Sequence, residues 1–165
     1  MQFQNKVVAI TGAAGGIGQE LCRHFGGLGA AIVALDLSEA VTGFAHQLRS
    51  EAMRVEAAVV DIVEADAVAS AFATVAAVLG PIDILVNNAG VSRNPSLERT
   101  TPGGFKDDVD ANLSGAYNCA HAVLPGMKAR RGGAIVNIGS VNGLAALGDA
   151  AYSANPETAT LIAGT

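Results

Sequence analysis

The chain alternates short apolar runs, rich in valine and isoleucine, with longer segments whose apolar residues recur at helical spacing. Runs of the first kind are typical of strands that are buried on both faces of a parallel sheet. The sequence predicts strands over residues 6–11, 31–35, 55–60, 82–86 and 134–138. It predicts helices between them, over residues 19–28, 39–50, 64–79 and 105–129, and a polar loop over residues 91–102.

This alternation indicates right-handed β-α-β crossovers, and therefore an α/β fold with a parallel sheet. We expect a Rossmann-like, doubly wound sheet of about five strands with helices on both faces. The 165 residues contain no internal repeat and no linker-like segment, so we predict a single domain over residues 1–165. Half of the residues are apolar and 15% are charged, which suits a sheet that is covered on both sides.

Charge and composition argue against several classes of protein. A formal net charge of −5 disfavours a surface for nucleic acid or for an anionic membrane. Cys22 and Cys119 match no metal-binding spacing and are expected to be reduced core thiols; the three histidines are scattered, so we expect no metal site. No secretory leader is apparent, and no uncharged stretch reaches the roughly 18 residues of a spanning helix. We therefore expect a cytoplasmic protein.

A glycine-rich turn follows the first predicted strand directly and leads into the first predicted helix. This order places the unpaired N–H groups of a helix N-terminus beside a turn with little side-chain bulk, where a pyrophosphate fits. Gly12 permits the tight turn, Gly16 lets the backbone approach the ligand, and Gly18 lets the helix pack closely on the strand. Such a turn can also serve only to join two elements, but here the flanking strand and helix are those that a dinucleotide site requires.

The second predicted strand ends at Asp36, 18 residues beyond Gly18. A carboxylate at this position accepts hydrogen bonds from both ribose hydroxyls of an adenosine and repels a 2′-phosphate. No arginine or lysine lies in the glycine turn, so the sequence favours NAD over NADP. The alternative role for Asp36 is a solvated helix cap before Ser38.

Small or polar residues follow the other predicted strands as well. They are Asp61, the run Asn87–Gly90, and Ser140. Ligands of doubly wound sheets bind beyond the carboxyl ends of the strands, so we expect these residues to face one site.

In order and spacing, these residues resemble the short-chain dehydrogenase/reductase family. The resemblance covers essentially the whole chain and rests on Thr11–Gly12, Gly16–Gly18, Asp36, Asp61, Asn87–Gly90, Asn112, Ser140 and Tyr152. It implies an NAD(H)-dependent oxidoreductase that interconverts a secondary alcohol and a ketone by hydride transfer. It also implies a homo-oligomer, either a dimer or a tetramer, formed through the long helix that starts near Phe105.

The resemblance assigns roles on the cofactor side of the site. Asp61 resembles the carboxylate that binds the adenine amine, although a helix cap before Glu64 is a compatible role. Asn88 resembles the residue that ties the fourth strand to its neighbours, and Ala89 and Gly90 line the cofactor. The cofactor-binding residues that it implies are Gly12, Gly16, Ile17, Gly18, Asp36, Asp61, Asn88, Ala89 and Gly90.

The resemblance implies three catalytic positions. Tyr152 is the general acid/base, Ser140 polarises the substrate oxygen, and Asn112 helps to hold a proton-relay water; by helix statistics alone Asn112 would be an ordinary exposed residue. A tyrosine has a pKa near 10, so it needs help to accept a proton at neutral pH. A hydrogen bond from Ser140 stabilises the charge that develops on the substrate oxygen.

The sequence departs from the family pattern close to Tyr152. The family has a lysine four residues after its tyrosine, whereas this chain has Pro156, and no lysine or arginine follows Arg131. Loss of that cation makes Tyr152 a poorer base. The residues 155–157 have the form of a helix N-cap with a first-turn proline, which suggests a local insertion or replacement.

Members of the family also continue through two more strands and a substrate-covering loop. We expect the chain to be either part of a longer polypeptide or a shortened relative, with its fifth strand left as an apolar edge. Weak or no turnover is then expected of these residues, and the substrate cannot be deduced. The alternatives are a non-catalytic dinucleotide-binding module that has lost the proton relay, and a truncation product that does not fold stably.

Overall fold

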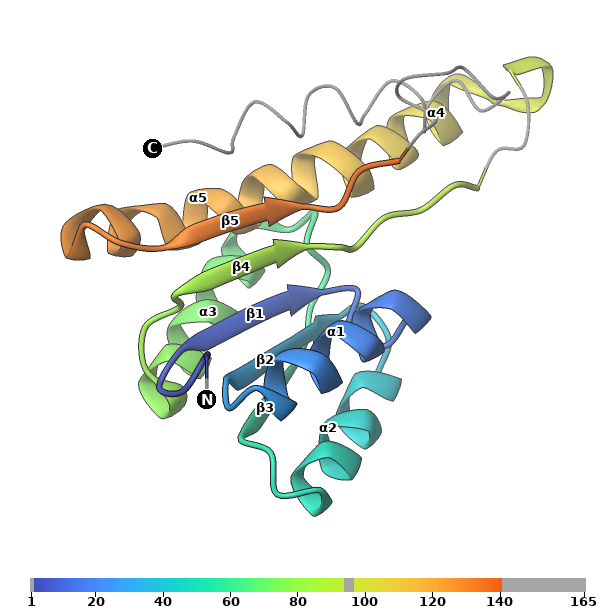
Figure 1. Ribbon diagram of the computed structural model, residues 1–165. Coiled ribbons are helices and arrows are strands. Elements are labelled where there is room, and N and C mark those ends of the chain that lie inside the picture. The colour runs from blue at the N-terminus through green and yellow to red at the C-terminus, as the bar shows by residue number, and fades with distance from the viewer. Residues whose placement is uncertain (1, 94–96, 141–165) are drawn as a thin grey trace.

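The computed structural model describes residues 2–93 and 97–140. Within them lies a five-stranded parallel sheet with the strand order β3-β2-β1-β4-β5 (Figure 1). The strands are β1 (Val7–Thr11), β2 (Ala31–Asp36), β3 (Val55–Val59), β4 (Ile84–Asn87) and β5 (Ala134–Asn137). The predicted fold, an α/β Rossmann-like doubly wound sheet, is confirmed.

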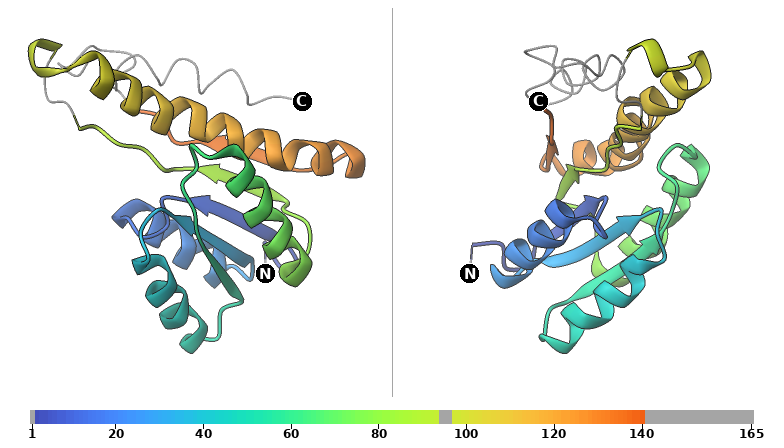
Figure 2. Two further views of the ribbon diagram at one scale, coloured as in Figure 1. Left: turned by 180° about the vertical axis from the view of Figure 1, so that it is seen from behind. Right: turned by 90° about the vertical axis from the view of Figure 1, so that its right-hand side faces the viewer.

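Helices cover both faces of this sheet (Figure 2). α1 (Gly16–Gly27) and α2 (Ala40–Ser50) pack on one face, and α3 (Ala65–Leu79) and α5 (Gly115–Arg130) pack on the other. Successive side chains of a strand point to opposite faces, which is why β1 contributes to both layers. Its Val8 and Ile10 pack with α1 and α2, whereas Val7 and Ala9 pack with α3 and α5.

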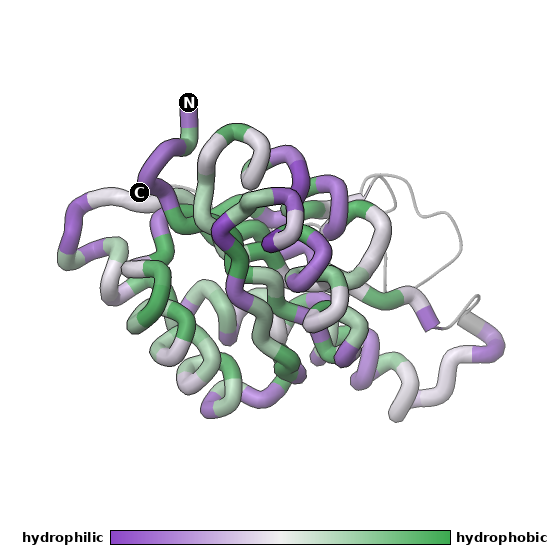
Figure 3. Tube along the Cα trace, turned by 90° about the horizontal axis from the view of Figure 1, so that it is seen from below, coloured by the Kyte–Doolittle hydropathy of each residue, from purple (hydrophilic) through white to green (hydrophobic). Residues whose placement is uncertain are grey.

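The hydropathy of the chain matches this layered arrangement. The strands form hydrophobic stretches inside the molecule, whereas the surrounding helices carry both hydrophobic and hydrophilic positions (Figure 3). This is the pattern of amphipathic helices on a sheet whose central strands are buried on both faces, whereas the edge strand β5 is partly exposed. Within residues 2–93 and 97–140, no helix combines the length and the apolar content needed to cross a bilayer.

The first helix begins earlier than the sequence predicted. α1 starts at Gly16 instead of residue 19, with Gly15 as its N-cap. The N–H of Gln19 donates to the Gly15 carbonyl oxygen and closes the first turn. Glycine has a low helix propensity and no apolar side chain, so hydrophobic spacing could not reveal this turn.

The long helix predicted over residues 105–129 is interrupted. It begins as α4 (Pro102–Val109), passes through a π-helical turn (Asp110–Ser114) and continues as α5. Thr101 caps α4 by accepting a hydrogen bond from the Gly104 N–H, and proline suits the first helical position. α5 continues through Pro125 to Arg130, one residue beyond the predicted end.

Both cysteines are free and buried, one on α1 and one on α5. Burial raises the pKa of the Cys22 thiol and of the Cys119 thiol to about 12. Because the thiolate is the reactive form, we expect neither thiol to react with Ellman's reagent at pH 8 in the native state. Both should react once the protein is unfolded in guanidinium chloride. Rapid release of one equivalent from the native protein would contradict this expectation.

Candidate functional site

A cleft of about 760 Å³ opens at the carboxyl ends of the parallel strands. This volume lies within the range of small-molecule and cofactor sites. The residues that line it lie at or after the ends of four strands, or where α4 meets the π-helical turn: Gly12, Ala14–Gly18, Asp36–Ser38, Ala40, Val60–Val63, Asn88–Val91, Arg93, Asp107, Asp110 and Ala111. All nine residues predicted to bind a cofactor therefore lie along one cleft.

The glycine turn forms the wall of the cleft between β1 and α1. Gly12 has a positive φ of 65°, and a Cβ atom there would lie 2.9 Å from the Ala89 Cα. A Cβ atom on Gly18 would lie 2.1 Å from the carbonyl oxygen of Gly12, which no side chain can accommodate without a backbone shift. Gly16, by contrast, has open space beside it. No side chain caps the N-terminus of α1 and no acidic residue lies in its first turn, so its N–H groups suit an anion.

Asp36 is held in place at the end of β2 by two backbone groups. Its Oδ2 accepts a hydrogen bond from the Ala14 N–H (2.9 Å), and its Oδ1 accepts one from the Ser38 N–H (2.8 Å). The contact with Ser38 is a local turn ahead of α2, whose N-cap is Glu39, so Asp36 does not cap that helix as the alternative had it. The contact with Ala14 fastens the carboxylate to the glycine turn. Each oxygen keeps a second lone pair, so the same carboxylate can accept further hydrogen bonds from a ligand.

Asp61 lies in the loop between β3 and α3 (residues 60–64), the third wall of the cleft. It is exposed. Its Oδ1 accepts a hydrogen bond from the Val63 N–H (3.0 Å), and its carbonyl oxygen accepts one from the Glu64 N–H (3.1 Å). The side chain thus organises the turn before α3 and also faces the cleft.

The exit of β4 is fastened to the exit of β1 through Thr11 and Asn88. The buried Thr11 hydroxyl oxygen accepts hydrogen bonds from the N–H groups of Asn88 and Ala89, both at 3.0 Å. The Asn88 Nδ2 donates to the carbonyl oxygens of Thr11 (2.9 Å) and Gly12 (3.3 Å). This network holds Ala89 and Gly90 against the glycine turn. No separate role for Thr11 was predicted from the sequence, although its position directly before the glycine turn was the available signal.

Asn112 lies in the π-helical turn, and its side chain pairs with the backbone of Val91. Its Oδ1 accepts from the Val91 N–H (2.7 Å), and its Nδ2 donates to the Val91 carbonyl oxygen (2.8 Å). Asn112 is half-buried, not the ordinary exposed residue of the alternative reading. In this structure it holds the segment after β4 in place, a contact that the sequence did not predict.

The other two predicted catalytic residues lie toward the end of the chain. Ser140 follows β5, the neighbour of β4, and the ends of these strands are joined by a hydrogen bond from the Asn87 Nδ2 to the Asn137 Oδ1 (2.9 Å). Ser140 is half-buried and is not among the described residues that line the cleft. Tyr152 and Pro156 lie outside the described residues.

Carboxylates dominate the charge of the cleft. Arg93 is the one cation among its described lining residues, and its Nη1 lies 3.9 Å from the Oδ1 of the buried Asp108. A hydrogen bond from Lys106 lowers the pKa of Asp110 from its ordinary value. Among the described residues, no lysine or arginine lines the cleft beside Asp36, so the surroundings of Asp36 disfavour an additional phosphate. In the described part of the chain, no cluster of three or more potential metal ligands is present.

Several lining residues were not identified from the sequence. They are apolar, or belong to the regions predicted as a loop and as the long helix: Leu37, Ile62, Val63, Val91, Arg93, Asp107, Asp110 and Ala111. Most of them reach the cleft because they adjoin a strand end, and their residue types carry no ligand-binding signal of their own.

Comparison with known proteins adds to this geometry. A family model described as short chain dehydrogenase matches residues 6–155. An uncharacterized oxidoreductase of Schizosaccharomyces pombe is 40% identical over 155 residues, which are 93% of this chain and 57% of that protein. The chain thus spans less than two thirds of the length of this curated relative.

Solved structures show the same fold. A gluconate 5-dehydrogenase of Burkholderia cenocepacia, in complex with NADP and tartrate, has a TM-score of 0.90 and 36% identity, and the match covers 97% of this chain and 64% of that one. A xylitol dehydrogenase with bound NAD+ has a TM-score of 0.90 and 29% identity, with coverage of 96% and 62%. Structural neighbours are thus described with either dinucleotide.

Proposed function

The chain belongs to the short-chain dehydrogenase family. On this premise we propose that it forms all or part of an NAD(H)-dependent oxidoreductase that interconverts a secondary alcohol and a ketone. The observation that carries the proposal is the Asp36 carboxylate, which is fixed to the glycine turn and faces the cleft. A dinucleotide fits the cleft because the cleft walls contain an uncapped helix N-terminus, a carboxylate that suits a ribose, and a glycine turn without large side chains.

Each part of the cofactor has residues that suit it. The N–H groups at the start of α1 would hold the pyrophosphate, and Asp36 would accept the hydroxyls of the adenosine ribose. Asp61, with Ile62 and Val63, would hold the adenine. Gly90 and Val91 also line the cleft, and Val91 pairs with the side chain of Asn112.

The choice of NAD over NADP follows from charge. A 2′-phosphate beside Asp36 would meet a carboxylate, and no cation of the described lining residues stands next to it. The structural neighbours include one with NAD+ and one with NADP, so the preference of this chain rests on its own residues.

When bound, the nicotinamide accepts or supplies a hydride at the reacting carbon. For the chain's own residues we propose that Tyr152 moves the hydroxyl proton and that Ser140 donates a hydrogen bond to the substrate oxygen. We assign Asn112 to positioning, because its amide pairs with the Val91 backbone. Pro156 supplies no positive charge, so turnover is expected to be slow.

This assignment predicts a gain of function. A cation near a phenol lowers its pKa by about 1–3 units. Each unit increases the phenolate fraction at neutral pH about tenfold, so Pro156→Lys is expected to raise NAD-dependent oxidation of a secondary alcohol by tenfold or more. Tyr152→Phe in the same background should remove the gain. The measurement is steady-state NADH formation over a panel of secondary alcohols.

Two results would count against the catalytic assignment. One is an unchanged rate in Pro156→Lys, with NADH still bound. The other is a Tyr152→Phe variant as active as its parent. NADH binding with no turnover in any variant would favour the second candidate, a non-catalytic dinucleotide-binding module, which Pro156 at the position of the family's lysine suggests.

The proposal includes the assembly and location expected from the sequence. We propose a single domain over residues 1–165, a homo-oligomer and a cytoplasmic location. Exposed aromatic side chains on the α4–α5 segment, Phe105 (40% exposed) and Tyr117 (56% exposed), support an interface there. Analytical ultracentrifugation distinguishes a monomer from a dimer or tetramer.

A further inference from the structure

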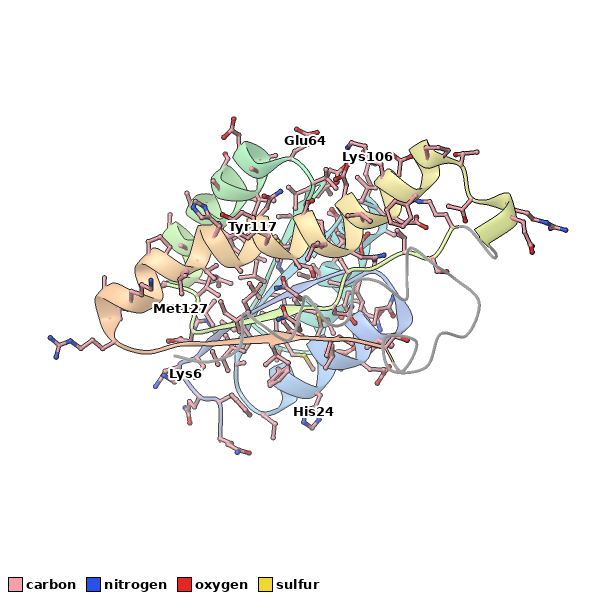
Figure 4. The ribbon with its side chains drawn as sticks, turned by 90° about the horizontal axis from the view of Figure 1, so that it is seen from above. Lys6, His24, Glu64, Lys106, Tyr117 and Met127 are labelled. Atoms are coloured by element: carbon pink, nitrogen blue, oxygen red, sulfur yellow. The ribbon has the colours of Figure 1, made fainter. Side chains whose placement is uncertain are left out.

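Helix α5 reaches across the molecule to the loop that forms the third wall of the cleft. The Nδ2 of the half-buried Asn118 donates to the carbonyl oxygens of Ile62 and Val63, each at 3.0 Å. One turn earlier, Gly115 lies against the Ile62 side chain, where a Cβ atom would be 2.5 Å from the Ile62 Cγ1. Figure 4 shows Tyr117, the neighbour of Asn118, on α5, and Glu64 at the end of this loop.

The loop is fastened at two places. At its start, the Val60 N–H donates to the Asp36 carbonyl oxygen (2.8 Å). Further on, the hydrogen bonds that Asp61 accepts from the Val63 and Glu64 N–H groups are local and fix only the shape of the turn. The Asn118 side chain connects that turn to helix α5 by donating hydrogen bonds to the carbonyl oxygens of Ile62 and Val63.

An amide is the side chain that suits this task. The NH2 group carries two hydrogens, and each is directed at one carbonyl oxygen. A carboxylate of the same shape has no hydrogen to donate and would face two carbonyl dipoles. The small volume of Gly115 lets α5 come close enough for the contact.

We propose that Asn118 is a positioning residue for the adenine end of the dinucleotide. It holds the loop so that Asp61, Ile62 and Val63 present one fixed surface to the base. The proposal rests on the proposed function, because it takes the cleft to be a dinucleotide site and Asp61 to accept from the adenine amine. It gives α5 a role in recognition, beyond its place in the core.

The test compares two cofactors that differ only at the base. Reduced nicotinamide hypoxanthine dinucleotide lacks the adenine amine of NADH. The dissociation constant of this analogue divided by that of NADH therefore reports on the amine contact, and the ratio exceeds one when the contact forms. Both are titrated by nicotinamide fluorescence. In Asn118→Ala we expect the affinity for NADH to fall roughly fivefold to tenfold, through loss of two hydrogen bonds that order the loop. The affinity for the hypoxanthine analogue should fall less, so the ratio moves toward one.

The matched control is Arg130→Ala, at the other end of α5. Arg130 also ties the helix to a backbone carbonyl, that of Ile82 (2.7 Å), but far along the chain from the cleft loop. This variant should keep the ratio of the unaltered protein. Gly115→Ala gives an independent route if Asn118→Ala does not fold, because alanine favours the helix yet displaces Ile62. It should lower the ratio as well.

The outcomes separate the two proposals. A lowered ratio in Asn118→Ala or Gly115→Ala, with an unchanged ratio in Arg130→Ala, supports the positioning role. An unchanged ratio in a folded Asn118→Ala variant overturns it, whether the two affinities stay the same or fall equally. If the unaltered protein binds neither cofactor, the proposed function itself fails, and the role of Asn118 fails with it.

Discussion

Gly18→Ala is expected to abolish measurable cofactor binding and to destabilise the protein. The new Cβ atom would lie 2.1 Å from the Gly12 carbonyl oxygen and 2.8 Å from the Ala13 Cα. Both are backbone atoms of the glycine turn, so the turn must move away from α1. Forcing extra volume into a packed site costs about 1–3 kcal/mol of unfolding free energy. The measurements are thermal unfolding and NADH fluorescence titration.

Two other glycines give matched controls. Gly43 lies within α2 with no atom near its added Cβ, so Gly43→Ala should stabilise the helix by up to about 1 kcal/mol and leave NADH binding unchanged. Gly16→Ala has the same open space beside its added Cβ atom, but stands where the backbone is proposed to contact the cofactor. It should keep its stability and lose affinity. Normal NADH binding by Gly18→Ala would show that the glycine turn does not hold the pyrophosphate of the cofactor.

Asp36→Ala is expected to remove the preference for NADH over NADPH. Hydrogen bonds to a charged group contribute about 1.5–3 kcal/mol, which corresponds to roughly a tenfold to hundredfold loss of NADH affinity. The same substitution should raise the affinity for NADPH, because a carboxylate no longer faces the 2′-phosphate. The measurement is the ratio of the two dissociation constants.

A second variant separates charge from structure. Asp36 also accepts hydrogen bonds from the Ala14 and Ser38 N–H groups, so Asp36→Ala loses some support for the glycine turn. Asp36→Asn keeps one carbonyl oxygen and nearly the same shape while removing the charge. It should still lose most of the discrimination against NADPH. If Asp36→Asn retains the full preference of the unaltered protein, charge at this position does not select the cofactor.

The fold could be predicted because its signal is local and repeated. The central strands are largely apolar runs, and the covering helices are amphipathic, so alternation along the chain identified the sheet. The same logic brought Gly12, Asp36, Asp61 and Asn88 together, because each follows a parallel strand and the strand ends share one edge.

What the sequence did not reveal depends on contacts between distant segments. The π-helical turn at Asp110–Ser114 accompanies the pairing of Asn112 with Val91, 21 residues earlier. The hold of Asn118 on Ile62 and Val63 spans more than 50 residues. Neither asparagine has a spacing that marks its partner, so single-chain patterns carry no record of either contact. Polar groups within a helix find such partners only in the packed structure.

The central claim is that the cleft binds a dinucleotide and selects NAD(H). The most direct test is a parallel equilibrium titration of the unaltered protein with NADH and with NADPH, monitored by nicotinamide fluorescence, since the sequence has no tryptophan to interfere. We expect saturable binding of both or of NADH alone, with NADH at least tenfold tighter, or about 1.4 kcal/mol. Equal affinities, a preference for NADPH, or no saturable binding of either cofactor would contradict the claim.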